Sequence, residues 1–225
     1  TYVAGYKTKG FTPMHLSVMD GGLDMVEYIY YMSLNYGGME VFLADTTGKV
    51  NLLSGSQPQL DGLKLSENGK KAAYLDTDAN TGDTILVEIE LGKEKAETVA
   101  TNVQSFGYIG NTLIYYFDYT EGVGTLGAAG SKTTIANASG VQFTEDAVYY
   151  VADADAATGN GELRAWDGKT ETAIAKDVFA FQYKENGKLV YIGKYDVNAG
   201  VGDLYYYDGK EARKLDTGIT AIFIY

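Results

Sequence analysis

The 225-residue sequence predicts an all-β fold built from one repeated antiparallel unit. Its composition, with 28 Gly, 20 Tyr and only 2 Pro among many Val, Ile and Thr residues, is typical of short strands and tight turns. Five segments share one pattern of strand, polar glycine-containing loop, strand, turn and strand. They are residues 28–53, 72–99, 113–136, 148–175 and 189–215.

The interval between the repeats predicts a β-propeller. The loop glycines chosen to align the repeats lie 37 to 44 residues apart, and a four-stranded propeller blade has about 40 residues. These anchors are Gly38, Gly82, Gly124, Gly161 and Gly202. A short fourth strand precedes each segment. The turns that join it to the segment contain Asp20-Gly21, Asn68-Gly69, Gly110-Asn111 and Asn186-Gly187, which accept positive φ in tight hairpins.

The two ends of the chain are expected to share a blade. Residues 218–225, "GITAIFIY", have the pattern of the inner strand of a further blade, and residues 1–11 precede the first full repeat. Pairing 219–225 with a strand from 1–11 would remove exposed sheet edges. We therefore expect five full blades plus a sixth shared by the termini, within one domain spanning residues 1–225. A five-bladed ring is the alternative.

Two local expectations follow from the repeats. Residues 20–32 have an apolar spacing that also fits a turn or two of helix, but their β-prone content favours a long strand from Val26 to Ser33. Gly202 is expected in a loop with positive φ, where a β-branched side chain would be poorly tolerated. In adjacent tyrosine pairs, one ring is expected to pack between blades and the other is available for exposure, because successive strand side chains point to opposite faces.

The units "NGKKAAYLDTDANTGDTILVEI" and "NGKLVYIGKYDVNAGVGDLYYYDGK" resemble the TolB-like and low-density-lipoprotein-receptor-like propellers of bacterial secreted or lipid-anchored proteins. The resemblance covers most of the chain from about residue 15. It implies a surface or periplasm-equivalent location and a scaffold or binding role.

Charge and composition limit the partners. A net charge of −12 and a pI near 4.5 disfavour binding to nucleic acid or to an anionic membrane. No apolar run is long enough to span a membrane, and the absence of cysteine excludes disulfides and thiol chemistry. The chain begins at Thr1 and is interpreted as a processed or trimmed form. We expect a monomer that is extracellular or anchored to a bacterial cell surface.

One loop is a candidate calcium site. Asp76, Asp78, Asn80 and Asp83 crowd the segment "DTDANTGD", and alternating oxygen side chains around a glycine can bind Ca²⁺. The spacing is not that of an EF-hand. The alternative is that these residues form Asx-turns at a hairpin tip. No other cofactor is expected.

The candidate ligand-contacting residues lie on the inner strands and on tyrosine-rich strands. Lys64, Gln104, Gln142 and Gln182 are expected to face a central channel, while Trp166 and Tyr206 occupy matching positions and could stack on sugars or peptides.

No catalytic set is evident in the sequence. His15 is the single histidine, whereas a Ser-His-Asp centre needs a histidine beside its nucleophile. The segment "GVGTLG", 122–127, has the Gly-x-Gly-x-x-Gly spacing but lacks a following helical pattern. The sequence therefore predicts a non-catalytic extracellular propeller that binds a protein or a glycan or serves as a scaffold. The alternative is a glycoside hydrolase or another carbohydrate-active enzyme, which would need two carboxylates in the channel.

Overall fold

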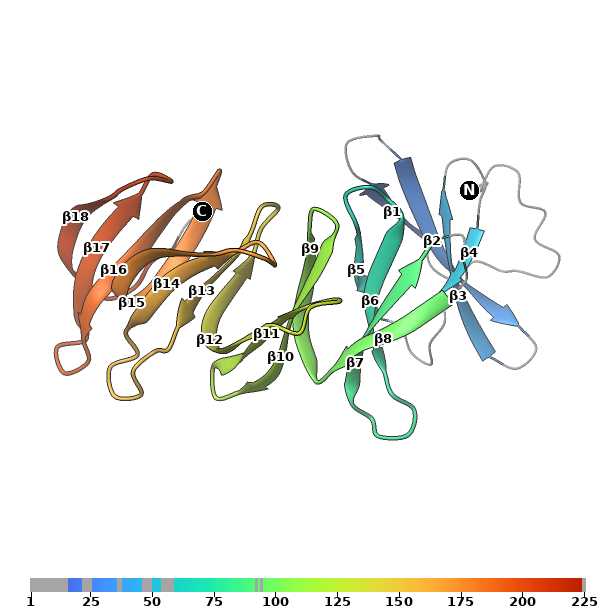
Figure 1. Cartoon of the computed structure of the whole chain (residues 1–225), viewed down its shortest axis with the longest axis horizontal. Coiled ribbons are helices and arrows are strands. Elements are labelled where there is room, and N and C mark those ends of the chain that lie inside the picture. The colour runs from blue at the N-terminus through green and yellow to red at the C-terminus, as the bar shows by residue number, and fades with distance from the viewer. Residues whose placement is uncertain are drawn as a thin grey trace. The chain divides into compact units, whose positions relative to one another are not determined.

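The structure, a computed structural model, describes the backbone of residues 16–21, 26–35, 38–45, 50–53, 59–91, 93 and 95–223, and the side chains of 62–91, 93 and 96–223. All helix and strand assignments in these residues are β-strand, as Figure 1 shows, which confirms the all-β prediction. The chain divides into two compact units, residues 1–104 with 110–113, and residues 105–109 with 114–225. The prediction of a single domain over 1–225 stays a prediction.

The first unit contains two four-stranded antiparallel sheets, each with its strands in chain order. The strands of one are β1 (Leu16–Gly21), β2 (Val26–Asn35), β3 (Gly38–Asp45) and β4 (Val50–Leu53). Those of the other are β5 (Gln59–Leu65), β6 (Lys71–Thr77), β7 (Thr84–Glu90) and β8 (Lys95–Thr101). Strand β2 confirms the choice of strand over helix from Val26 onward.

The remaining strands form one ten-stranded antiparallel sheet, again in chain order, and most of it belongs to the second unit. They are β9 (Val103–Ile109), β10 (Thr112–Thr120), β11 (Val123–Ala128), β12 (Thr134–Phe143), β13 (Val148–Ala152), β14 (Gly161–Trp166), β15 (Glu171–Glu185), β16 (Lys188–Asp196), β17 (Val201–Tyr207) and β18 (Ala212–Ile219).

Two long strands divide this sheet into three four-stranded groups. The first part of β12 pairs with β11 and its second part with β13, and β15 is shared in the same way between β14 and β16. Each therefore serves as the last strand of one group and the first strand of the next. The groups are β9–β12, β12–β15 and β15–β18, which matches the predicted four-stranded repeat.

A left-handed residue lies before the first group, at both passages between groups and near the end of the last group. The φ angles are 55° at Asn102, 55° at Asn137, 53° at Asp177 and 70° at Gly218. Asn, Asp and Gly are the residue types that adopt this conformation at least cost, and a single such residue bends a strand out of its sheet. The residues that follow are Val103, Ala138, Val178 and Ile219.

The hydrophobic core lies between consecutive groups. One buried cluster joins Tyr116 and Leu126 to Tyr150 and Trp166 of the β12–β15 group. A second cluster joins the opposite face of that group to the β15–β18 group, with Tyr149 among its members. Adjacent tyrosines thus point to opposite faces as predicted, but both rings of this pair are buried because the group has a neighbour on each side.

The hairpin glycines correct the predicted alignment of the repeats. Gly82, Gly159 and Gly200 have positive φ and close equivalent loops, in which each N–H donates to the carbonyl of the aspartate four residues earlier. Gly161 and Gly202 instead lie within β14 and β17. The prediction of a positive φ at Gly202 is wrong, because this glycine has ordinary strand geometry.

The predicted tight turns are confirmed where the structure describes them. Gly69, Gly110, Asn186 and Gly187 have positive φ, as expected for short hairpins. The turn after Asp20-Gly21, residues 22–25, lies outside the described residues. The first partner in the predicted pairing of the chain ends, residues 1–11, also lies outside them, and Thr220–Phe223 have no strand assignment.

Candidate functional site

The residues predicted to bind calcium form a capped hairpin loop between β6 and β7. The Asp78 carboxylate accepts hydrogen bonds from the N–H groups of Asn80 (2.8 Å) and Thr81 (3.1 Å), and these bonds lower its pKa. Asp76 is buried and accepts a bond from the N–H of Thr77 at 2.8 Å. Among the described residues, no three His, Cys, Asp or Glu side chains converge as a metal site. The calcium prediction at Asp76, Asp78, Asn80 and Asp83 stays a prediction.

The same cap recurs in the later repeats. The Asp155 carboxylate accepts bonds from the N–H groups of Ala157 (3.0 Å) and Thr158 (2.9 Å), and Asp196 accepts from those of Asn198 (2.9 Å) and Ala199 (3.2 Å). The "Asp-x-x-x-Gly" spacing is therefore a turn signal of the repeat, which accounts for the recurring aspartates without a ligand.

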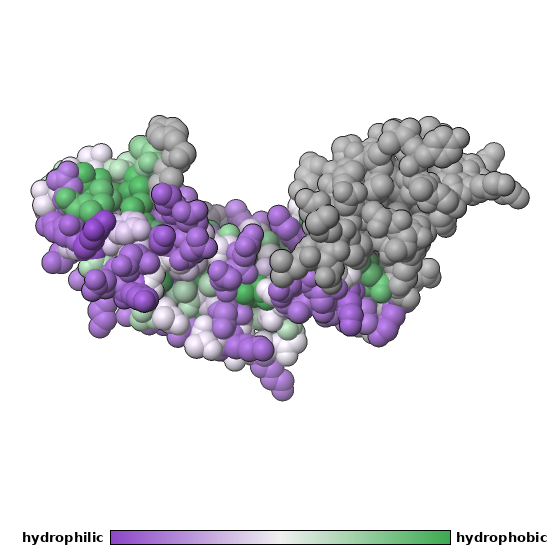
Figure 2. Space-filling view, turned by 90° about the horizontal axis from the view of Figure 1, so that it is seen from above, coloured by the Kyte–Doolittle hydropathy of each residue, from purple (hydrophilic) through white to green (hydrophobic). Residues whose placement is uncertain are grey.

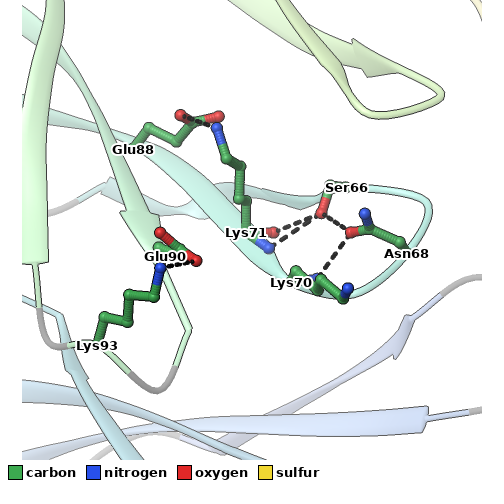
Figure 3. A network of polar contacts seen from close by, with 7 residues as sticks. All are labelled: Ser66, Asn68, Lys70, Lys71, Glu88, Glu90 and Lys93. Atoms are coloured by element: carbon green, nitrogen blue, oxygen red, sulfur yellow. Dashed lines mark hydrogen bonds and ion pairs between the residues drawn. The ribbon is translucent and has the colours of Figure 1, made fainter.

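The Figure 3 network shows how the β5–β6 hairpin is closed. Ser66, which is buried, accepts a bond at Oγ from the N–H of Lys71 (3.0 Å) and lies 3.0 Å from Oδ1 of Asn68. Lys71 extends to Glu88 on β7, with 2.8 Å between Nζ and Oε2. These polar side chains bond to one another and to the backbone of the hairpin and its sheet, so their contacts are structural.

Gln142, one of the predicted channel residues, bonds to the backbone of the neighbouring group. Its Nε2 donates to the carbonyl of Phe181 at 3.0 Å, and its Oε1 accepts from the N–H of Tyr183 at 3.0 Å. One side-chain amide therefore joins β12 to β15 in the manner of a strand hydrogen-bond pair. Both ends of this amide are engaged in the structure.

The other predicted ligand residues come from both units. Lys64 and Gln104 of the first unit are exposed, and Gln182 of the second is half-buried on β15. Trp166 is 2% exposed within the cluster between two groups, whereas Tyr206 is half-buried with Arg213 over its ring at 5.1 Å. Contact of these residues with a ligand stays a prediction.

A charged network crosses the β12–β15 group. Glu171 Oε1 accepts bonds from the Tyr150 hydroxyl and from Arg164 Nη1, both at 2.5 Å, and Arg164 Nε donates to Glu162 Oε2 at 2.6 Å. Burial raises the pKa of Tyr150, and the carboxylate beside it adds to the rise. Burial alone would also raise the pKa of Glu171, but the bonds from Arg164 and Tyr150 outweigh it and lower that pKa.

The candidate functional site is an aromatic stack at the junction of the β12–β15 and β15–β18 groups. The rings of Phe179 and Tyr195 lie face to face, with their centroids 3.9 Å apart and an interplanar angle of 8°. Phe179 is 37% exposed, and Val197, two residues beyond Tyr195, is 51% exposed. Large exposed apolar side chains that are already ordered against each other are suited to bind a ligand.

The loop between β13 and β14 fixes this stack. Asn160 Nδ2 donates to the carbonyl of Tyr195 at 3.0 Å, and its Oδ1 accepts from the N–H of Tyr195 at 3.3 Å. A Cβ added at Gly159 would lie 3.1 Å from Cε2 of Phe179, so the loop backbone packs directly on that ring. Sequence reasoning missed this pair, although its aromatic residues and the Thr158-Gly159-Asn160 turn were visible.

The chain has the fold of a β-propeller, on the evidence of solved structures. It matches acylaminoacyl peptidase in complex with Z-Gly-Gly-Phe-chloromethyl ketone with a TM-score of 0.51 and 12% identity, over 88% of this chain and 39% of that one. It matches the β-propeller domain of the Trilobed protease from Pyrococcus furiosus, described as having an open velcro topology, at 0.51 and 13%, over 89% and 71%. It matches the tricorn protease at 0.51 and 13%, over 99% and 29%.

The chain spans well under half the length of the acylaminoacyl peptidase and tricorn chains. TolB from Acinetobacter baumannii is also similar, with a TM-score of 0.43 and 13% identity over 90% of this chain and 55% of that one. No protein-family model matches the sequence. No curated protein matches it either. The described residues contain no helix with the length and hydrophobicity to cross a membrane.

These matches overturn the predicted function. The sequence suggested a non-catalytic binding or scaffold propeller, with a carbohydrate-active enzyme as the alternative, whereas the matches with a TM-score of 0.51 are a peptidase and two proteases. The prediction was wrong because the repeat pattern encodes hairpins and packing between groups. The repeat pattern specifies the fold and does not specify the function of the protein that contains it.

Proposed function

We propose that this chain is the propeller part of a peptidase and that it holds peptide substrates for cleavage. The observation that carries the proposal is that the three matches reported with a TM-score of 0.51 are a peptidase and two proteases. The net charge of −12 and the aromatic pair of exposed Phe179 and half-buried Tyr195 suit extended peptides, whose side chains offer both apolar and cationic groups.

The division of labour follows from residue types. A Ser-His-Asp peptidase centre uses a histidine as general base, and His15, the single histidine of the sequence, lies outside the described residues. We therefore assign to residues 62–223 the binding and positioning of the peptide, with bond cleavage carried by other residues of the peptidase.

Retention of peptides tests this proposal. The immobilised chain is exposed to a mixture of short synthetic peptides and, separately, to a mixture of neutral oligosaccharides, and mass spectrometry identifies what is retained. Selective retention of a subset of peptides is the expected result. Retention of oligosaccharides with no peptide, or of neither class, would overturn the proposal.

We further propose that a sixth sheet completes the propeller from the two chain ends. The support is a difference in burial at equivalent positions. Leu163 pairs with Val151 and is fully buried by the next group, while Leu204 pairs with Ile192 in the same way and is only half-buried. Figure 2 shows hydrophobic surface over the β16–β18 end of the second unit. Residues 219–225 with a strand from 1–11 would cover Leu204 and its neighbours.

We propose that the protein is related to TolB-like propellers and lies outside the bacterial cell or on its surface. The motif resemblance and the acidic, cysteine-free composition support kinship with TolB-like propellers and an extracellular or surface-anchored location in a bacterium. We also propose a monomer that neither inserts into the membrane nor binds nucleic acid. Protease accessibility on intact cells and sedimentation of the purified chain test the location and the oligomeric state.

A further inference from the structure

We propose that the Phe179–Tyr195 stack is a subsite for an arginine side chain of a bound peptide. This inference rests on the proposed function and names the chemistry of the substrate. The guanidinium group would lie flat on the exposed part of the Phe179 ring, and the neighbouring carboxylates would neutralise its charge.

The stack is not required by the repeat. Val178 and Ala138 occupy the same place, each opposite the glycine near the start of the third strand of its group. The residue after Ala138 is Ser139, where Phe179 follows Val178. Since the preceding group forms with a small polar residue at this position, the repeat itself does not require an aromatic ring here.

The residue at the position of the partner ring also varies between the groups. Tyr195 follows the left-handed Lys194 and precedes the capping Asp196, and the corresponding residue of the preceding group is Ala154, between Asp153 and Asp155. In the β9–β12 group the position is Tyr119, after the left-handed Asp118. At this position of the repeat, the β15–β18 group carries the one face-to-face aromatic pair among the described groups of the second unit. A second stacked pair, Tyr191–Tyr205, lies elsewhere in the same group.

The stack is held in place before any ligand binds. The two-way bond between Asn160 and the backbone of Tyr195 fixes one ring, and Gly159 packs against the other. The loop that carries both residues is itself closed by a bond from the N–H of Gly159 to the carbonyl of Asp155 at 2.7 Å. A rigid platform loses little conformational entropy when a side chain binds to it.

The charges around the stack favour a cation. Four exposed aspartates lie within the loops and strand starts that form it, whereas two exposed lysines, Lys176 and Lys194, lie in the same segments. The aspartates are Asp153, Asp155, Asp177 and Asp196. An aromatic face attracts a cation, and arginine, being planar and weakly hydrated, stacks on such a face better than lysine does. An arginine side chain therefore fits the platform and the surrounding charge together.

An NMR titration, in which the amide chemical shifts of the protein are monitored as peptide is added, tests the inference. The probe is the N-acetylated, C-amidated peptide Gly-Gly-Arg-Gly-Gly, and its control is the same peptide with citrulline, which keeps the shape of arginine but is neutral. Saturable shifts are expected at the amides of Gly159, Asn160 and Tyr195, with the citrulline peptide weaker by about two- to fivefold. Equal affinity for the two peptides would overturn the inference.

Three variants locate the subsite. Phe179→Ser and Tyr195→Ala place in this group the residues that the preceding group carries, so they are compatible with the fold. Each is expected to weaken binding of the arginine peptide by about two- to fivefold. The matched control is Tyr119→Ala, which removes a 46%-exposed tyrosine from the corresponding position of another group and is expected to leave the affinity unchanged.

The failure of this inference is distinguishable from failure of the proposed function. Peptides that are retained by the chain but bind Phe179→Ser as tightly as the wild type would contradict the arginine subsite and leave the proposed function standing. Absence of any peptide retention would contradict both. Shifts at the same amides with a neutral oligosaccharide such as cellopentaose, and none with the peptide, would assign the platform to a sugar and overturn the inference.

Discussion

A Cβ atom added at Gly202 would lie 2.5 Å from Cγ2 of Ile192 on the paired strand β16. It would also lie 2.9 Å from the carbonyl oxygen of Gly193. Gly161 has the same relationship with β13, since its added Cβ would lie 2.4 Å from the carbonyl oxygen of Ala152. The glycine near the start of the third strand is therefore required by the close approach of the second strand.

Gly202→Ala is expected to destabilise the protein by about 1 to 3 kcal/mol, because the added methyl group overpacks a site with no space. Chemical denaturation measures this change. Ile192→Ala is itself destabilising because Ile192 is buried, but in that background Gly202→Ala should cost less than in the wild type, since removal of Cγ2 relieves one of the two close contacts. A free energy of unfolding equal to that of the wild type in Gly202→Ala would contradict the steric explanation.

Gly82→Ala is the matched control, because any destabilisation at this position comes from backbone conformation and not from steric overlap. Gly82 has a φ of 78° with nothing within 4 Å of an added Cβ, so this substitution isolates the cost of the left-handed conformation, about 1 kcal/mol. The Ile192→Ala background should not alter that cost.

Gln142→Ala is expected to cost about 1 to 3 kcal/mol, because it leaves the carbonyl of Phe181 and the N–H of Tyr183 without their side-chain partner. Thermal or chemical unfolding measures the loss. Gln104→Ala, at an exposed glutamine of another inner strand, is the control and should change stability by less than about 0.5 kcal/mol. Equal effects of the two substitutions would show that the amide bonds across the groups contribute nothing.

Glu171→Gln tests the charged network through pH. The pKa of Glu171 is lowered in the folded protein, so its ionised form contributes stability that is complete above the unfolded value of about 4.3. That contribution is lost as the pH falls through the lower folded pKa. The wild type should exceed Glu171→Gln by about 1 kcal/mol near neutral pH, a modest value because the pair is partly exposed. The difference should shrink below about pH 4. A difference that is independent of pH would contradict the assignment.

Deletion of residues 219–225 tests the proposed sharing of a sheet by the chain ends. If that sheet forms, the deletion exposes several large apolar side chains and should cost several kcal/mol, at about 1.5 to 3 kcal/mol for each. Phe223 is 77% exposed in the described structure, so without a partner strand its loss costs little. A truncated chain that unfolds at the same denaturant concentration as the parent would contradict the shared sheet.

Much of the fold could be predicted from residue types because each repeat is formed by local signals. Asn186-Gly187 and Asn68-Gly69 mark hairpins whose glycines have positive φ, and the tyrosine pairs mark strands with two covered faces. The alignment of the glycines was wrong at Gly202 because a glycine in a strand and a glycine in a loop look alike in sequence. Only the position of Ile192 distinguishes them.

The candidate site could not be predicted, since it depends on contacts across groups. Phe179 lies on β15, whereas Asn160 lies in the loop between β13 and β14. The bond from Asn160 to the backbone of Tyr195 joins residues 35 positions apart in the sequence. Gln142 was predicted to face a ligand for the same reason, because its partners at Phe181 and Tyr183 lie about 40 residues along the chain, one repeat away. Sequence periodicity places residues on a strand but does not identify what lies opposite them in the next group.

Peptide hydrolysis by the protein isolated from its source tests whether this propeller serves a peptidase. Cleavage of an arginine-containing peptide is measured by mass spectrometry for the wild type and for Phe179→Ser. We expect cleavage by both proteins, with KM raised by about two- to fivefold in the variant and kcat unchanged, because the proposed subsite binds the substrate away from the reacting bond. Failure of the wild-type protein to cleave any peptide in a diverse mixture would contradict a role in a peptidase.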